Sequence, residues 1–130
     1  MKTSLTLSIL GAYNALMGVL MLFLPGKMAL TMIGANRAAE NPDLEQMATM
    51  FHYGLAPALL MIGLILIMIR TCDMETAKRS LLAYVIATAV LLTLFFTVFS
   101  GSTVMDFSVE MAAPDMLALT LALFGYFKAK

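Results

Sequence analysis

Four long apolar stretches constrain the fold of this chain more than any other feature. A bilayer core about 30 Å thick needs roughly 20 apolar residues per crossing helix. The sequence offers four such stretches, and we predict helices at about 4–24, 42–69, 73–100 and 107–127. Of its 130 residues, 62% are hydrophobic and 12% are charged, against roughly 45–50% and about 25% in soluble domains. The sequence therefore predicts an all-α integral membrane protein, a four-helix bundle in which residues 1–130 form a single transmembrane domain.

The basic residues predict the orientation of this bundle, because Lys and Arg near short loops are retained on the cytoplasmic side. The opposite side of the predicted bundle carries only Lys27 and Arg37. The side that holds both termini carries Lys2, Arg70, Lys78, Arg79, Lys128 and Lys130. We therefore expect both termini on the cytoplasmic side of a bacterial inner membrane. Nucleic-acid binding is not expected, because the bases are scattered rather than clustered with aromatic residues.

Helix-capping signals mark the predicted ends. Leu24-Pro25-Gly26 is expected to stop the first helix, and a polar connection follows. Asn41-Pro42-Asp43 is expected to start the second helix, with Asn at the N-cap and Pro at the first helical position. Asp73 can cap the third helix in the same way. The apolar run after Lys2 is longer than the 7–15 residues of a signal-peptide core, so we expect it to be retained as a helix.

Small residues predict the faces that turn inward, because helices in lipid approach closely where side chains are small. The predicted inward stripes are Gly11, Asn14 and Gly18; His52, Ala56, Leu59 and Gly63; Ala83, Ala87 and Val90; and Asp115, Ala118, Ala122 and Gly125. Polar residues lie on these stripes and are therefore expected inside the bundle. Tyr53, Tyr84 and Tyr126 fit an aromatic belt at the membrane boundaries, whereas Tyr13 lies at mid-depth.

Asp115 is the most informative residue, because an acid inside a transmembrane segment is costly and indicates function by default. Two interpretations are open. Pro114 can be the first residue of a short fourth helix, with Asp115 stabilised by the helix dipole near the outer boundary. Alternatively, one helix from about Phe107 passes through Pro114 with a kink, and Asp115 faces a polar interior.

His52, the only histidine, is predicted at a depth similar to that of Asp115, so these two side chains could pair. The candidate ligand-binding residues of this polar pocket are His52, Asp115, Glu110, Asn14 and Tyr53. The alternative is an interhelical hydrogen bond that only fixes packing, worth about 0.6 kcal/mol on average. One histidine and one cysteine provide no metal-ligand spacing, so neither a metal nor a cofactor is expected. The 13 methionines are interpreted as flexible apolar fillers.

The order of these features resembles that of the DoxX-like small four-helix membrane proteins. The shared features are an N-terminal helix ending in Leu24-Pro25-Gly26, a long second helix after a polar loop, and four helices within 130 residues. The resemblance covers the architecture and no sequence motif. It implies a four-helix membrane fold and, for some members, a role as accessory subunit of quinone-linked oxidoreductases. It assigns no catalytic residue to this chain.

Two functions of different classes fit the sequence. The first is a non-enzymatic oligomeric or accessory subunit, whose partners are the lipid bilayer and either further copies of the chain or a larger membrane complex. The second is binding or transport of a proton, a cation or a small amphipathic molecule, such as a lipid or quinone-like ligand, through an outward-facing pocket around His52 and Asp115. An enzyme ranks third, since the sequence offers no nucleophile with a base and no phosphate loop.

Overall fold

The computed structural model describes residues 3–128, and within them it contains helices, turns and irregular segments but no strand. Helices α1 (Thr3–Phe23), α4 (Pro42–Met68), α5 (Met74–Leu94) and α6 (Val109–Phe127) account for the four spans that are long and apolar enough to cross a membrane. A 3-10 turn at Ile69–Thr71 extends α4, and a π-helical turn at Phe95–Phe99 extends α5. The all-helical prediction is confirmed, and the four apolar helices support an integral membrane protein.

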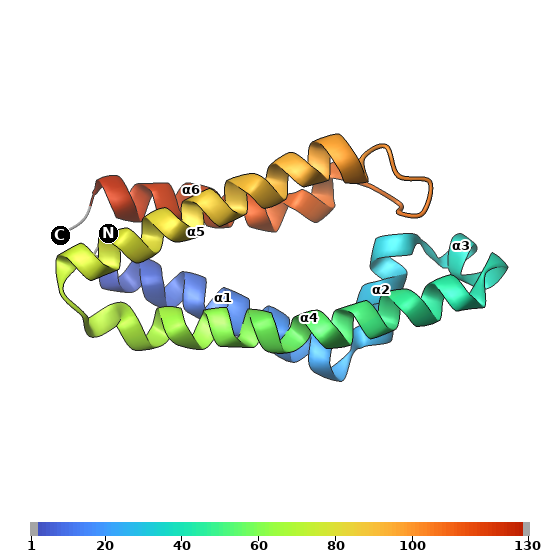
Figure 1. The fold of residues 1–130 in the computed structure, drawn as a ribbon, viewed down its shortest axis with the longest axis horizontal. Coiled ribbons are helices and arrows are strands. Elements are labelled where there is room, and N and C mark those ends of the chain that lie inside the picture. Colours follow the sequence, from blue (N-terminus) through green and yellow to red (C-terminus); the bar gives the residue numbers. More distant parts are fainter. Residues whose placement is uncertain (1–2, 129–130) are drawn as a thin grey trace.

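The spanning helices form two pairs, α1 with α4 and α5 with α6 (Figure 1). We call the end where α1 begins and α6 ends the terminal end; the turn between α4 and α5 also lies there. The opposite end, here the far end, holds α2 (Pro25–Ile33), α3 (Ala35–Glu40) and the 100–108 loop.

Glycine allows the backbones of α1 and α4 to touch. Gly11, Gly18 and Gly63 are buried along this contact. A Cβ atom built on Gly63 would lie 2.3 Å from the backbone nitrogen of Ala15, and one built on Gly18 would lie 2.6 Å from that of Leu60. The predicted inward stripes of the first two helices are confirmed at these positions, and the contact depends on the absence of side chains.

The main apolar core lies toward the terminal end, where all four spanning helices contribute to it. Its buried members are Leu7, Leu10, Leu66, Ala77, Leu81, Ala118 and Ala122. A second cluster at the far end draws only on α2, α3 and α4, through Ala29, Ile33, Ala38 and Ala48. Since α4 makes at most slight contact with α5 or α6, the two pairs meet mainly through α1, which contacts both α5 and α6.

Both predicted N-caps are confirmed. The Asn41 side chain accepts a hydrogen bond from the Leu44 backbone nitrogen at 3.2 Å, with Pro42 as the first residue of α4. Asp73 accepts one from the Thr76 backbone nitrogen at 2.9 Å and one from the Thr76 hydroxyl at 2.6 Å. The side-chain and backbone hydrogen bonds from Thr76 hold the pKa of Asp73 below its ordinary value.

The predicted polar connection after the first helix is wrong for most of its length, because residues 25–40 form α2 and α3. Pro25 starts α2 at a position where its missing N–H costs nothing. Pro25, Ala29 and Ile33 recur at intervals of four residues, and all three are buried. Gly34, with φ 82°, separates α2 from α3. Nine residues are too short for a membrane span, so span length gives no signal for α2.

Two expectations about the third and fourth helices are wrong. The interpretation of Pro114 as a helix start is wrong, because α6 begins at Val109 and continues through the proline. The inward stripe predicted for the third helix, Ala83, Ala87 and Val90, is also wrong, because all three residues are exposed. The buried residues of α5 are Ala77, Leu81 and Thr88. Small size alone misassigned this face, since larger side chains fill the α5 contact.

Candidate functional site

A cluster of four polar side chains lies between α1, α5 and α6, near the middle of their lengths. The Tyr13 hydroxyl donates a hydrogen bond to Asp115 Oδ1 at 3.2 Å. The Asn14 amide donates to the Tyr84 hydroxyl at 3.0 Å and to the Leu10 carbonyl at 2.8 Å. We call Tyr13, Asn14, Tyr84 and Asp115 the polar cluster. Because Tyr13 and Asn14 are adjacent on α1, they connect α6 and α5 to the same point of that helix.

The sequence of α6 explains why Asp115 points toward α1. Ala112, Ala118 and Ala122 are buried, and Asp115 lies three residues from the first two, on the same side of the helix. Asp115 itself is only half-buried. Its second carboxylate oxygen, Oδ2, has no hydrogen-bond partner among the described residues. The fully buried side-chain oxygen that lacks a partner in these residues is Thr6 Oγ1, so Asp115 Oδ2 is not fully buried. This oxygen is therefore at least partly accessible.

No basic side chain neutralises Asp115 in the part of the chain that the structure describes. The salt bridge found there joins Arg79 to Glu75, on the exposed first turns of α5. An ionised carboxylate in a region of low dielectric constant is costly without a partner charge. The site is therefore suited to hold a proton, or a cationic or hydrogen-bond-donating group, near Asp115.

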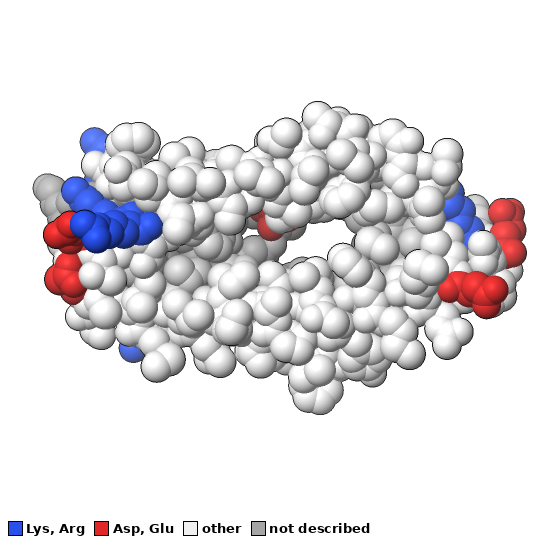
Figure 2. All heavy atoms as spheres, in the orientation of Figure 1, with Lys and Arg blue, Asp and Glu red and all other residues white. Residues whose placement is uncertain are grey.

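The two helix pairs separate beyond the polar cluster, toward the far end. Figure 2 shows an opening between them that passes through the molecule, with one acidic side chain at its edge. We call this space the lateral opening. It lies between the α1/α4 pair and the α5/α6 pair, and it faces the sides of the molecule where lipid would surround the spanning helices.

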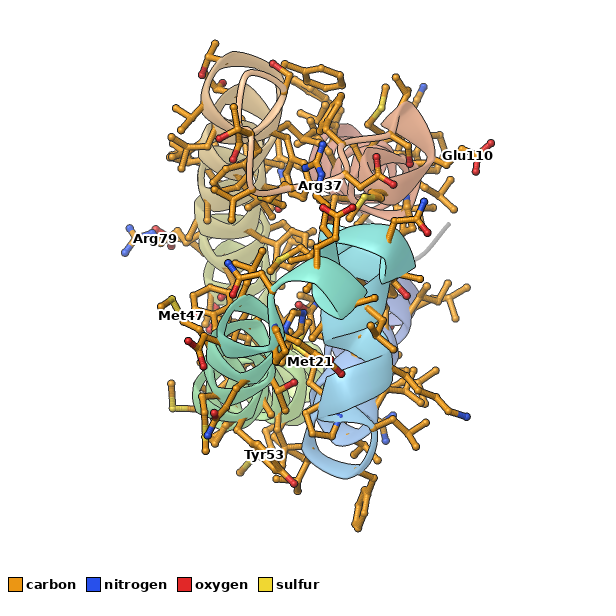
Figure 3. The ribbon with its side chains drawn as sticks, turned by 90° about the vertical axis from the view of Figure 1, so that its right-hand side faces the viewer. Met21, Arg37, Met47, Tyr53, Arg79 and Glu110 are labelled. Carbon is orange, nitrogen blue, oxygen red and sulfur yellow. The ribbon has the colours of Figure 1, made fainter. Side chains whose placement is uncertain are left out.

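The far end of the lateral opening is covered by contacts between the 25–40 segment and the 100–108 loop. Arg37 Nη1 donates to the Met105 carbonyl at 2.7 Å, and the Asp106 backbone nitrogen donates to the Met32 carbonyl at 3.0 Å. Figure 3 views the molecule from this end and shows Arg37 between the two layers of helices. Access along the long axis is therefore obstructed, while the lateral sides stay open.

The structure brings together two of the five residues that the sequence suggested, Asn14 and Asp115. His52 does not pair with Asp115; it is buried, and its Nδ1 donates to the Ala48 carbonyl of its own helix at 2.7 Å. Tyr53 and Glu110 are exposed, and Figure 3 shows both directed away from the interior. A similar depth in the membrane did not imply proximity, because His52 faces the α1 and α2 side of α4.

Sequence reasoning did not assign Tyr13 or Tyr84 to the site. Tyr84 fits an aromatic belt by its position, yet its hydroxyl accepts from Asn14 in the interior. Tyr13 carried a usable signal, because a tyrosine at mid-depth does not belong to a belt and needs a hydrogen-bond partner. Pairing mid-depth tyrosines with mid-depth acids would have identified the Tyr13–Asp115 contact.

The fold and the polar cluster define an all-helical protein with four potential membrane spans and a hydrogen-bonded acid between them. Comparison with known protein families, with curated proteins and with solved structures finds no match for the chain.

Proposed function

We propose that the protein is a small membrane-embedded binding protein, which holds an amphipathic molecule in the lateral opening with its polar end at Asp115. The observation that carries this proposal is the position of the polar cluster. It lies where the helix pairs begin to separate, at the edge of the lateral opening nearer the terminal end, and this opening faces lipid. A lipid-soluble molecule could place its apolar body between the helix pairs and donate a hydrogen bond to the free carboxylate oxygen. The accessible oxygen of Asp115 provides the acceptor.

The residues beside the cluster suit an apolar guest. Met17 lies one turn from Tyr13 toward the far end, on the same face of α1, and is half-buried. Met111 lies one turn from Asp115 in the same direction on α6 and is also half-buried. Methionine side chains are flexible and adapt to irregular guests.

The proposal includes an orientation, with the terminal end in the cytoplasm and the far end outside, in a bacterial inner membrane. The excess of Lys and Arg at the terminal end supports it, and most of the basic side chains visible in Figure 2 gather there. In this orientation the lateral opening lies in the outer half of the bilayer.

Photolabelling tests the proposed binding. The protein is placed in phosphatidylcholine nanodiscs with a long-chain alcohol that carries a diazirine near its hydroxyl. We expect adducts on α1 and α6 near Tyr13 and Asp115. Met17→Trp should suppress them by filling the lateral opening, whereas Leu16→Trp, at a lipid-facing position that is 58% exposed, should not. Labelling spread evenly over the lipid-facing surface, and unchanged by Met17→Trp, would show that the site does not bind.

A second candidate function, an oligomeric or accessory subunit of a membrane complex, is favoured by the exposure of α5. In the most apolar 18-residue stretch of this span, only 11% is buried inside the protein, whereas the corresponding share for α1 is 39%. Ile86 and Val90 on α5 are 58% and 56% exposed. Native mass spectrometry from nanodiscs would test this candidate, because a strictly monomeric protein that co-purifies with no other chain would argue against it.

A further inference from the structure

We infer that the lateral opening selects amphipathic cations, that is, molecules with a positively charged nitrogen head and an apolar tail. This inference rests on the proposed binding function and adds the chemical class of the ligand. Three observations carry it: the accessible oxygen of Asp115, the absence of a counter-ion near it among residues 3–128, and the covered far end.

The charge around Asp115 is unbalanced in the structure. The groups that face it are Tyr13 of α1, which donates a hydrogen bond, and the neighbouring Tyr84 of α5, which belongs to the same cluster. The α1 helix contains no Lys, Arg or His, and neither does α6. The bases of α5, Lys78 and Arg79, lie in its first two turns at the terminal end. A cationic head would provide the counter-charge that residues 3–128 do not supply.

The ion pair would form in a region of low dielectric constant. Opposite charges attract each other more strongly there than in water, so a cationic head gains more from Asp115 than an uncharged hydroxyl does. A carboxylate head would be repelled. The remaining cost of bringing the cation from water is smaller for a weakly hydrated organic ammonium than for a small inorganic ion.

The covered far end favours access from the bilayer. Arg37 lies at that end between the two helix layers (Figure 3), and its hydrogen bond to the Met105 carbonyl helps to cover the aqueous side. The α5 helix beside the lateral opening presents mostly apolar residues outward, and many of them are exposed. An amphipathic cation already dissolved in the membrane would therefore reach Asp115 with its tail left in lipid.

Competition against the photolabel tests the chemical class. The competitors share one chain length and differ in head group: dodecyltrimethylammonium, dodecanol and dodecanoate, with tetramethylammonium as the head group alone. We expect the long-chain cation to suppress labelling at a concentration about tenfold lower than the alcohol, which corresponds to about 1.4 kcal/mol. Dodecanoate and tetramethylammonium should compete more weakly than the alcohol.

Asp115→Asn provides the matched variant, because it keeps the shape of the side chain and one acceptor oxygen and removes the charge. In this variant the cation should lose its tenfold advantage over dodecanol, while the alcohol continues to compete. Tyr13→Phe keeps the charge and should retain the order of the competitors. It also serves as a second reporter if Asp115→Asn fails to fold by circular dichroism.

The outcomes separate the two proposals. If the cation and dodecanol compete equally in the wild-type protein, the selection of cations is overturned while localised binding stands. If tetramethylammonium competes as well as its long-chain counterpart, the ligand is not amphipathic and the inference is again overturned. If the photolabel itself is not localised to the opening, the proposed binding function fails and the inference fails with it.

Discussion

Replacing Gly63 with alanine tests whether direct backbone contact holds α1 against α4. A Cβ atom at this position would lie 2.3 Å from the Ala15 backbone nitrogen, 2.7 Å from the Ala15 Cα atom and 2.7 Å from the Gly11 carbonyl oxygen. All three neighbours are backbone atoms, so no side chain can rotate away. Because ordinary contact begins at about 3.4 Å, the two helices would have to separate locally by about 1 Å.

A gap of this size removes a quarter to a half of the dispersion energy of the atoms that face it. Overpacking of well-packed sites costs about 1–3 kcal/mol, and the immobile backbone places this site near the upper value. Alanine also favours a helix over glycine by about 1 kcal/mol. The free energy of unfolding of Gly63→Ala should therefore fall by about 2 kcal/mol.

Gly54→Ala is the matched control, because it lies on the same helix and its added Cβ would have no neighbour within 4 Å. We expect this variant to be unchanged or stabilised by up to about 1 kcal/mol. Both variants can be unfolded with SDS in mixed micelles and followed by circular dichroism. If Gly63→Ala proves as stable as Gly54→Ala, the close α1–α4 contact is not present in the protein.

Three further predictions concern the ends of the helices. Asn41→Ala removes the N-cap of α4 and should lower the free energy of unfolding by about 1 kcal/mol, measured by the same SDS titration. The pKa of Asp73 is lowered in the folded protein, so its ionised form stabilises the fold above the ordinary pKa of about 3.9, and this stabilisation disappears as the pH falls through the lower folded value. Asp73→Asn cannot titrate and should therefore show a smaller drop in melting temperature between pH 6 and about pH 2. An equal drop would contradict the capping role. Gly34→Ala places a Cβ atom at a residue with φ 82°, 3.1 Å from Asp106 Oδ2, at a cost of about 1–3 kcal/mol. It should speed hydrogen exchange of the Asp106 amide, which donates to the Met32 carbonyl. Unchanged exchange would show that the hydrogen bond from Asp106 to Met32 does not hold the far end.

Much of the fold could be predicted from the sequence because it is encoded locally. Span length depends on consecutive apolar residues, and the caps at Asn41 and Asp73 depend on neighbours within three positions. The glycines of α1 and α4 identify a close contact without naming its geometry. The short α2 helix could not be predicted in this way. Its three buried residues are buried by packing against α4, and a contact so distant in the sequence is not encoded locally.

The candidate site depended more on tertiary structure. The sequence identified Asp115 and Asn14 as polar groups within the membrane, because burying such groups is costly anywhere in lipid. It did not identify their partners, since helical periodicity places a residue on a face but does not fix how that face is rotated and shifted against its neighbours. In the tertiary structure Tyr13 donates a hydrogen bond to Asp115, whereas His52 bonds the Ala48 carbonyl of its own helix. The same arrangement separates the two helix pairs and forms the lateral opening.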